Sequence, residues 1–208
     1  MRYLVCFLVV GVTPALAVIN GLVDGFEDGT TMNWTISAPL QLLSGGPGGV
    51  GDTYLSVDSS SSLALRNNSD RWGGNYPASH VTGIEVDIRA TSVPLQVRLF
   101  VGSPPGSLAA TTSSVLIPAD GQWHHAEFSL APSDLTLLSN KGGELSTLLG
   151  DVYSISFWHQ PGPPALVAGP SPGVVGFDNI QAVPEPGVSL LFLWGLSLLP
   201  RSRAVSLV

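Results

Sequence analysis

Apolar and polar residues alternate with a period of two along the middle of the chain, the pattern of half-buried β-strands. The clearest example is Val81–Arg89, in which valine and isoleucine alternate with Glu85, Asp87 and an arginine. A second alternating segment, Leu95–Val101, follows after a connection of five residues. Because this connection is short, we expect the two segments to form a hairpin in which Arg98 and the first segment's arginine neutralise the two acids.

The rest of the middle region repeats this pattern of short apolar segments and turn-forming connections. Eight further strands are expected, at Leu22–Glu27, Leu40–Leu43, Thr53–Val57, Leu63–Arg66, Ser113–Ile117, Gln122–Leu130, Val152–Trp158 and Val174–Ala182. The glycine-rich run at 45–51 predicts a flexible loop, and the leucines of 132–149 predict one or two helical turns over a sheet edge. Short strands with such connections favour an all-β fold, a two-sheet antiparallel β-sandwich of the jelly-roll type.

The N-terminal end has the three parts of a secretory signal peptide. A positive start at Met1–Arg2 precedes the apolar segment Tyr3–Val12 and the small residues Ala15–Ala17. This order predicts a signal helix over residues 1–17, with cleavage after Ala17. The only cysteine, Cys6, lies within it, so the exported chain would contain neither a disulfide nor a reactive thiol.

The C-terminal end carries a second apolar segment, Gly187–Leu199, which predicts a hydrophobic helix. Polar residues and prolines flank it, with Val183, Pro184, Glu185 and Pro186 before it and Arg201 and Arg203 after it. At a rise of about 1.5 Å per residue, this helix would span about 20 Å, less than the roughly 30 Å of a bilayer core. The alternative is that the segment forms a buried strand or helix of the folded domain.

Proline–glutamate–proline, an apolar run and arginines, in this order, resemble the PEP-CTERM sorting signal of Gram-negative envelope proteins. The resemblance implies a sorting tail over 183–203, with its motif at 184–186, its helix at 187–199 and its basic end at 201–203, before a tail end at 204–208. It also implies a membrane processing enzyme of the exosortase type as a partner. The protein would be anchored transiently in the inner membrane, then delivered to the cell surface or the extracellular medium.

Between these ends lies one domain, residues 18–182, with a strongly acidic composition. It holds five of the eight basic residues and fourteen of the fifteen acids, a formal charge of −9. Such a domain is repelled by nucleic acid and anionic membranes, so a nucleic-acid partner is excluded. A neutral ligand, such as an extracellular polysaccharide, or a divalent cation suits this charge.

Two acidic motifs bracket the domain, one around Glu27 and one at Asp178-Asn179. They resemble the first and last strands of jelly-roll carbohydrate-binding modules, in which an early Phe-Glu segment and a late aspartate share a structural calcium. The resemblance implies Glu27 and Asp178 as ligands, with Asp24 and Asp28 beside them. Carboxylates and loop carbonyls are the oxygen ligands that Ca²⁺ prefers. The alternative is that these acids are solvated turn residues.

Three aromatic residues, Trp72, Tyr76 and Trp158, lie in predicted loops or at a strand end. Flat aromatic faces beside polar donors are typical of sites where a sugar ring packs, so these residues are candidate ligand-binding residues. Core packing at the ends of the sandwich is the alternative.

A catalytic interpretation depends on Glu85 and Asp87, whose segment partly resembles the Glu-x-Asp-x-x-Glu strand of retaining jelly-roll glycosidases. Such enzymes need two carboxyl groups about 5 Å apart, and the third acidic position is here Ala90. Adjacent strand residues point to opposite faces, so His124 and His125 cannot share a metal. We therefore expect no catalytic residues. The sequence favours an exported, non-enzymatic surface or matrix protein, with a carbohydrate-binding module as the alternative and a glycosidase as a third hypothesis.

Overall fold

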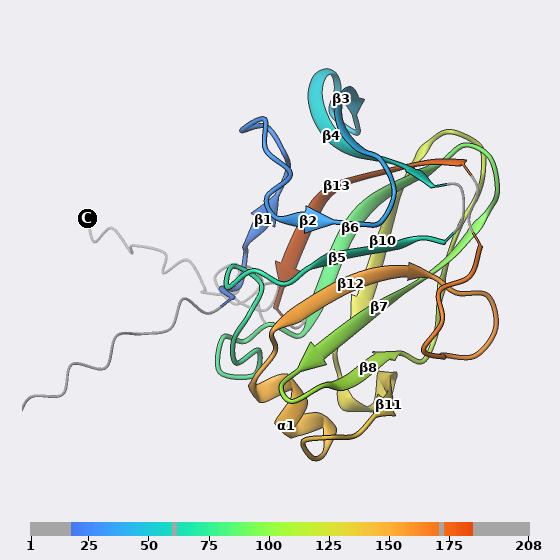
Figure 1. The fold of residues 1–208 in the computed structure, drawn as a ribbon. Helices are drawn as coiled ribbons and strands as arrows, with labels where there is room; N and C mark the ends of the chain where they lie inside the picture. Colours follow the sequence, from blue (N-terminus) through green and yellow to red (C-terminus); the bar gives the residue numbers. More distant parts are fainter. Residues whose placement is uncertain (1–17, 60–61, 171–172, 185–208) are drawn as a thin grey trace, which may run out of the picture.

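The computed structural model describes residues 18–59, 62–170 and 173–184, which form an antiparallel β-sandwich (Figure 1). This confirms the predicted fold class. The predicted signal peptide, the hydrophobic helix and the sorting-signal residues Glu185, Pro186, Arg201 and Arg203 lie outside the described residues. Within the described ranges, no helix combines the length and the apolar composition needed to cross a membrane.

Two sheets form the layers, and we name them sheet A and sheet B. Sheet A holds β1 (Val23–Asp24), β3 (Leu40–Gly46), β4 (Gly49–Ser59), β6 (Gly83–Ala90), β10 (Trp123–Ser129) and β13 (Gly173–Val183). Sheet B holds β2 (Trp34–Thr35), β5 (Ala64–Asn67), β7 (Leu95–Ser103), β8 (Ser107–Thr111), β9 (Val115–Ile117), β11 (Leu135–Ser139) and β12 (Ser154–His159). The order in sheet A is β10-β6-β13-β4-β3, with β1 on β13, and the order in sheet B is β11-β8-β7-β12-β5-β2, with β9 on β7.

The predicted hairpin between β6 and β7 is wrong, because the chain crosses from sheet A to sheet B between them. β6 pairs with β10 and β13, whereas β7 pairs with β8, β9 and β12. Both strands still turn their apolar residues toward the shared core, which is all that the alternation determines. The acids of β6 and Arg98 of β7 therefore lie on different sheets.

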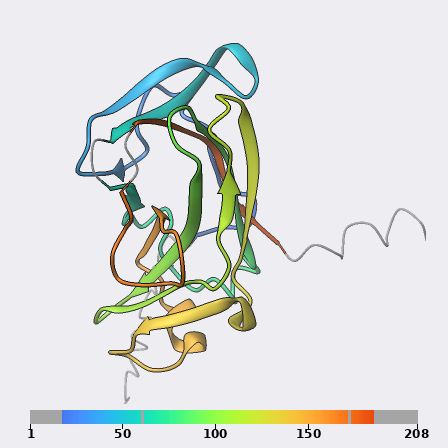
Figure 2. The same ribbon diagram turned by 90° about the vertical axis from the view of Figure 1, so that its right-hand side faces the viewer.

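The segment 132–149 contains the expected helical turns, with a strand between them that was not expected. A 3-10 turn, η1 (Pro132–Asp134), leads into β11, and the short helix α1 (Leu145–Gly150) follows. Figure 2 shows β11 and α1 at one end of the sandwich and the β3–β4 hairpin at the other. That hairpin corrects the flexible-loop prediction for 45–51, since Gly46 pairs with Gly49 around a two-residue turn.

Aromatic rings connect the two sheets through the core. Phe157 of β12 lies at the centre, with its ring centroid 5.6 Å from Trp34, 5.6 Å from Phe128 and 5.9 Å from Phe177. All four side chains are buried, at 3% exposure or less. Since Phe128 and Phe177 belong to sheet A and the other two to sheet B, this cluster fixes the sandwich in one packing arrangement.

The last strand, β13, extends one residue into the predicted sorting tail. Val183 pairs with Gly83 of β6 and its carbonyl accepts a hydrogen bond from the backbone N–H of Thr82 at 3.0 Å. Val183 is therefore part of the sandwich, which corrects its assignment to the tail. Pro184 follows the strand and is exposed.

Candidate functional site

Asp24, predicted as a calcium ligand, is instead the acceptor of a buried hydrogen-bond network. Its carboxylate is 0% exposed and accepts the indole N–H of Trp34 at 2.8 Å and that of Trp72 at 2.7 Å. Arg71 Nε donates to its other oxygen at 2.6 Å, which also makes an ion pair. Both oxygens of this carboxylate are therefore occupied by protein donors. The prediction for Asp24 is wrong.

Asp28 also differs from its predicted role. Its carboxylate accepts hydrogen bonds from the backbone N–H of Thr30 at 2.8 Å and from the Thr30 hydroxyl, and the residue is exposed. A short acidic side chain that accepts a hydrogen bond from the backbone N–H two residues later stabilises a tight turn. Asp28 is therefore a turn residue, which corrects its assignment as a ligand.

Asp178 has the features of a metal ligand. The residue is fully buried, and its Oδ1 accepts the backbone N–H of Asn179 at 2.7 Å while Oδ2 has no hydrogen-bond partner. An unsatisfied buried carboxylate oxygen costs free energy, which a bound cation or protonation of the carboxylate would relieve. Burial, together with the charges of Asp52, Asp87 and Glu27, raises the pKa of Asp178 to about 7, against the lowering effect of the Asn179 N–H.

The surroundings of Asp178 fit a calcium ion. The carboxylates of Asp178 and Asp52 converge over Gly46, where a Cβ would lie 2.7 Å from one Oδ2 and 2.4 Å from the other. Only glycine leaves this space open. Glu27 is near enough for its charge to raise the pKa of Asp178, and its Oε1 accepts the backbone N–H of Thr53, the neighbour of Asp52, at 2.9 Å. Carboxylates with no imidazole or thiolate are a hard-oxygen donor set, which suits Ca²⁺.

Asp52 is a candidate ligand that the sequence analysis does not identify, although its position after a glycine-rich run is one signal for it. It follows the glycine-rich run at 45–51, whose composition predicts a flexible loop. The hairpin turn brings its carboxylate to the backbone N–H of Gly48, which donates to Oδ2, and toward Asp178. An acid at the end of such a run is a recognisable candidate only once the run is known to be a hairpin.

Trp72 and Tyr76 do not present their rings to a ligand. Trp72 is 0% exposed and packs edge-on against Trp34, with ring centroids 6.0 Å apart. Tyr76 is 1% exposed, and its hydroxyl donates to the carbonyl of Trp72 at 2.8 Å. Burial raises the pKa of the Tyr76 phenol far above its usual range. Both residues belong to the core, which corrects their assignment as ligand-binding residues.

Trp158 lies on the outer face of sheet B and is the candidate aromatic that remains accessible. Its ring stacks on Phe100 of β7, with centroids 4.1 Å apart and an interplanar angle of 20°. On the β5 side it borders a pocket of about 360 Å³, lined by Thr35, Ile36, Ser37, Ala64, Arg66 and Trp158. Cross-strand pairing explains this placement, because Trp158 pairs with Ala64 on one side and with Arg98 on the other.

Arg98 stabilises the connection that follows Trp158. Its guanidinium donates to the carbonyls of Thr111 at 2.8 Å, of Thr112 and of Gly162, and the residue is 4% exposed. Burial lowers the pKa of Arg98. Gly162 lies in the connection between β12 and β13, so this arginine fastens that connection to the sheet next to Trp158 instead of neutralising the acids of β6.

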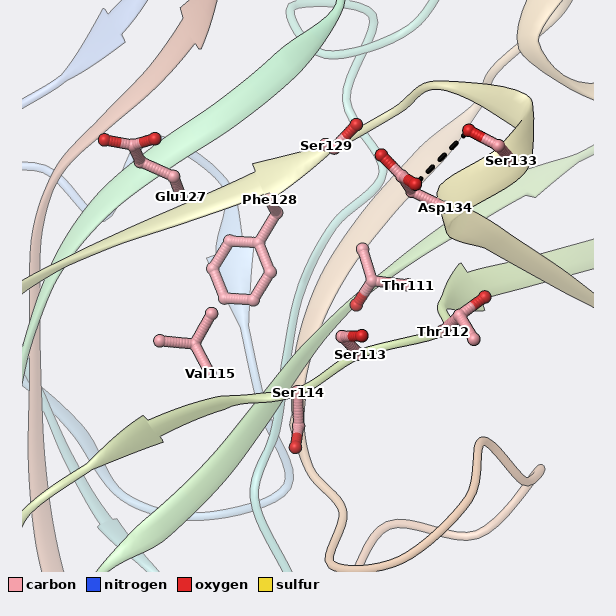
Figure 3. Close-up of a pocket in the computed structure, with 10 residues that line it drawn as sticks. All are labelled: Thr111, Thr112, Ser113, Ser114, Val115, Glu127, Phe128, Ser129, Ser133 and Asp134. Carbon is pink, nitrogen blue, oxygen red and sulfur yellow. Dashed lines mark hydrogen bonds between the residues drawn. The ribbon is translucent and has the colours of Figure 1, made fainter.

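A second polar pocket lies where the two sheets meet beside β10 (Figure 3). It encloses about 370 Å³ and is lined mainly by hydroxyl groups, from Thr111, Thr112, Ser113, Ser114, Ser129 and Ser133. In Figure 3, the Phe128 ring points toward Val115, whereas the Glu127 carboxylate points away from Val115. The pocket has no accessible aromatic face, and is therefore less suited to a sugar ring than the pocket beside Trp158.

The two carboxylates of the glycosidase hypothesis lie on the outer face of sheet A. Glu85 is opposite Glu127 of β10, and Asp87 is opposite His125. His124 lies on the other side of β10, where its Nε2 is 2.9 Å from Asp120. The two adjacent histidines thus diverge as predicted, but no local sequence pattern indicates that β10 brings His125 to the acids of β6.

No model of a protein family and no curated protein matches the sequence. A family 11 carbohydrate-binding module from Clostridium thermocellum, in complex with a β-1,3-1,4-mixed-linked tetrasaccharide, is similar in structure, with a TM-score of 0.51 and 16% identity over 81% of this chain and 98% of that chain. The solution structure of CtCBM11 is also similar, with a TM-score of 0.53, 15% identity and the same coverage.

An exo-β-agarase is similar as well, with a TM-score of 0.55 and 18% identity over 84% of this chain. This chain spans only 26% of the agarase chain. At such identities the likeness shows the fold alone. The chain has the jelly-roll β-sandwich fold of carbohydrate-binding modules.

Proposed function

We propose that this domain is a non-catalytic carbohydrate-binding module that recognises an extracellular polysaccharide on the outer face of sheet B. The alternative from the sequence thus becomes the main interpretation, ahead of a purely structural matrix role. The observation that carries it is the placement of Trp158, half-buried and backed by Phe100, beside the pocket that contains Arg66 and Thr35.

The physical basis of this recognition is the pairing of a rigid aromatic face with polar side chains. Phe100 holds the Trp158 ring in one orientation, so little conformational entropy is lost when a sugar ring packs on it. The exposed guanidinium of Arg66 and the hydroxyls of Thr35 and Ser37 supply hydrogen bonds to sugar hydroxyls. These groups are neutral or positive, which suits a neutral or acidic glycan despite the acidic composition of the domain.

The calcium site is part of the same proposal, with Asp178, Asp52 and Glu27 as its side-chain ligands. The ion would join the segment after β1 to the β3–β4 hairpin and to β13. Its role is stability, since Asp178 and Asp52 lie on sheet A and Trp158 lies on sheet B. When bound, the ion would balance the negative charge of the buried Asp178 carboxylate.

Export and sorting complete the proposal, and they rest on the sequence. Residues 1–17 would direct export, and the segment from Pro184 onward would be handled by an exosortase-type enzyme during a transient inner-membrane stage. Mass spectrometry of the protein recovered from the envelope or medium of its native host tests this directly. A start at Val18 and an end near Glu185 support the proposal, and an intact chain of 208 residues in the cytoplasm contradicts it.

Binding is tested by affinity electrophoresis of the purified protein in gels that contain soluble polysaccharides. Mixed-linked β-glucan and agarose are the first probes, because one similar structure holds a β-1,3-1,4-mixed-linked tetrasaccharide and another is an exo-β-agarase. Retardation that saturates with polysaccharide concentration supports the function. No retardation across neutral and acidic glycans would favour the matrix role.

A further inference from the structure

Three carboxylates surround one imidazole on the outer face of sheet A. The antiparallel register of β6 and β10 places Glu127 opposite Glu85, and His125 opposite Asp87. His125 Nε2 lies 3.7 Å from Glu85 Oε2 and 3.9 Å from Glu127 Oε1. Glu85, His125 and Glu127 each offer one ligand atom within 4.8 Å of the other two. The three residues therefore converge on one point outside the sheet.

Asp87 sets the orientation of the imidazole. Its Oδ1 lies 3.0 Å from His125 Nδ1, and its Oδ2 accepts a hydrogen bond from Asn179 Nδ2 of β13 at 2.9 Å. Because a carboxylate only accepts, the proton of the neutral imidazole is on Nδ1 and the lone pair is on Nε2. That lone pair is on the atom nearest Glu85 and Glu127. A carboxylate behind the imidazole is the arrangement that orients histidine ligands in metal sites.

The charges of this group are not balanced by the protein. Like charges directly opposite each other on paired strands are destabilising, and Glu85 and Glu127 are such a pair. Across residues 18–59, 62–170 and 173–184, no lysine or arginine nitrogen lies within 4.0 Å of the carboxylates of Glu85, Asp87 or Glu127. Arg89 instead donates to the Tyr54 hydroxyl at 2.8 Å. One protonated imidazole would leave a net charge of −2 on this group, whereas a dication beside a neutral imidazole would leave −1.

We propose that Glu85, His125 and Glu127 bind a transition-metal dication, with Zn²⁺ as the occupant, and that Asp87 positions His125. Zinc binds nitrogen and oxygen ligands at about 2.0–2.2 Å, so tetrahedral ligands lie about 3.4 Å apart. The two distances from His125 Nε2, 3.7 and 3.9 Å, exceed this value by a few tenths of an ångström, and a ligand atom of Glu85 lies within 4.8 Å of one of Glu127. The fourth position is open to water, and the imidazole distinguishes this site from the all-oxygen group around Asp178.

The site would fasten an edge strand. β10 is the outermost strand of sheet A on the β6 side, and the metal would join the two through side chains of both. The sequence has one cysteine, at position 6, so the folded domain cannot use a disulfide for this purpose. A metal that binds only the paired strands stabilises the folded state by mass action.

Zinc titration of the purified full-length chain by isothermal calorimetry, with excess Ca²⁺ to fill the oxygen site, tests the proposal. We expect saturable binding of one Zn²⁺ per chain and a visible Co²⁺ spectrum typical of nitrogen and oxygen ligation. His125→Ala should abolish both signals. His124→Ala is the matched control, because this neighbour lies on the other side of the strand and should bind Zn²⁺ as the wild type does.

Asp87→Asn tests the positioning role separately. We expect Zn²⁺ affinity to fall about 10–100-fold while the Co²⁺ spectrum of the saturated site keeps its form. If His125→Ala does not fold, Glu127→Gln is the second test of the ligand set, because Glu127 is the most exposed of the three ligands. The proposal is overturned by the absence of saturable wild-type binding, or by equal losses in His124→Ala and His125→Ala.

Discussion

The carboxylate of Asp24 accepts the indole N–H of Trp72 at 2.7 Å inside the sandwich. A second indole, that of Trp34, donates to the same oxygen, and Arg71 donates to the other. This single acid thereby holds β1, β2 and the loop after β5 together. The tryptophan predicted to bind a ligand and the aspartate predicted to bind a metal are thus partners of each other.

Asp24→Ala should strongly destabilise the domain. It would leave two buried indole N–H groups without an acceptor and remove the partner of Arg71, at a cost of about 3–5 kcal/mol in the free energy of unfolding. Urea denaturation followed by tryptophan fluorescence measures the change. Asp28→Ala, at the exposed turn nearby, is the control, with an expected cost of about 0.5 kcal/mol. Equal costs for the two variants would show that Asp24 has no special role.

Calcium should raise the thermal stability of the protein, and a chelator should lower it. At calcium a hundredfold above Kd, binding contributes about 2.7 kcal/mol, or about 5–10 °C in Tm for a domain of this size. Asp178→Asn should abolish this response and should melt above the wild type in chelator, because a buried unneutralised charge has been removed. Differential scanning calorimetry with and without chelator decides this. A calcium response that persists in Asp178→Asn would place the ion elsewhere.

The buried His159 should make stability depend on pH. Its Nδ1 accepts the backbone N–H of Gln96 at 3.0 Å, and burial lowers its pKa below the usual 6.5. The unfolded chain therefore takes up a proton that the folded state excludes. This stabilisation is complete above pH 6.5 and is lost as the pH falls toward the folded-state pKa.

Denaturation curves of the wild type and His159→Gln from pH 8 to pH 5 measure this contribution. The wild type should lose more stability on acidification than the variant, because other titrating groups are common to both. Parallel pH profiles would mean that His159 does not contribute.

The sequence predicted the fold class because alternation reports which side of a strand is buried. It could not predict strand neighbours, and the β6–β7 hairpin failed for that reason: both strands alternate correctly, yet their connection crosses between sheets. Strands β2, β8 and β11 were missed, since they are short or lie in segments with turn formers or a run of leucines.

The site was predicted less completely than the fold. Trp158 lies at an accessible strand position, whereas the loop position of Trp72 concealed a buried ring. Loop position is a weak indicator of exposure when an acid elsewhere, here Asp24, can accept the indole N–H. The Glu85–His125 juxtaposition depends on pairing between strands almost forty residues apart, and no local pattern encodes it.

The most direct test of the proposed function compares Trp158→Ala with Trp123→Ala in affinity electrophoresis on the polysaccharide that retards the wild type. Trp123 is the control because it lies on the outer face of sheet A, packed edge-on against Tyr54 with centroids 5.1 Å apart. Loss of the Trp158 face should cost about 2 kcal/mol, a roughly thirtyfold weaker affinity, while Trp123→Ala binds as the wild type does. Unchanged retardation of a folded Trp158→Ala protein would contradict the account.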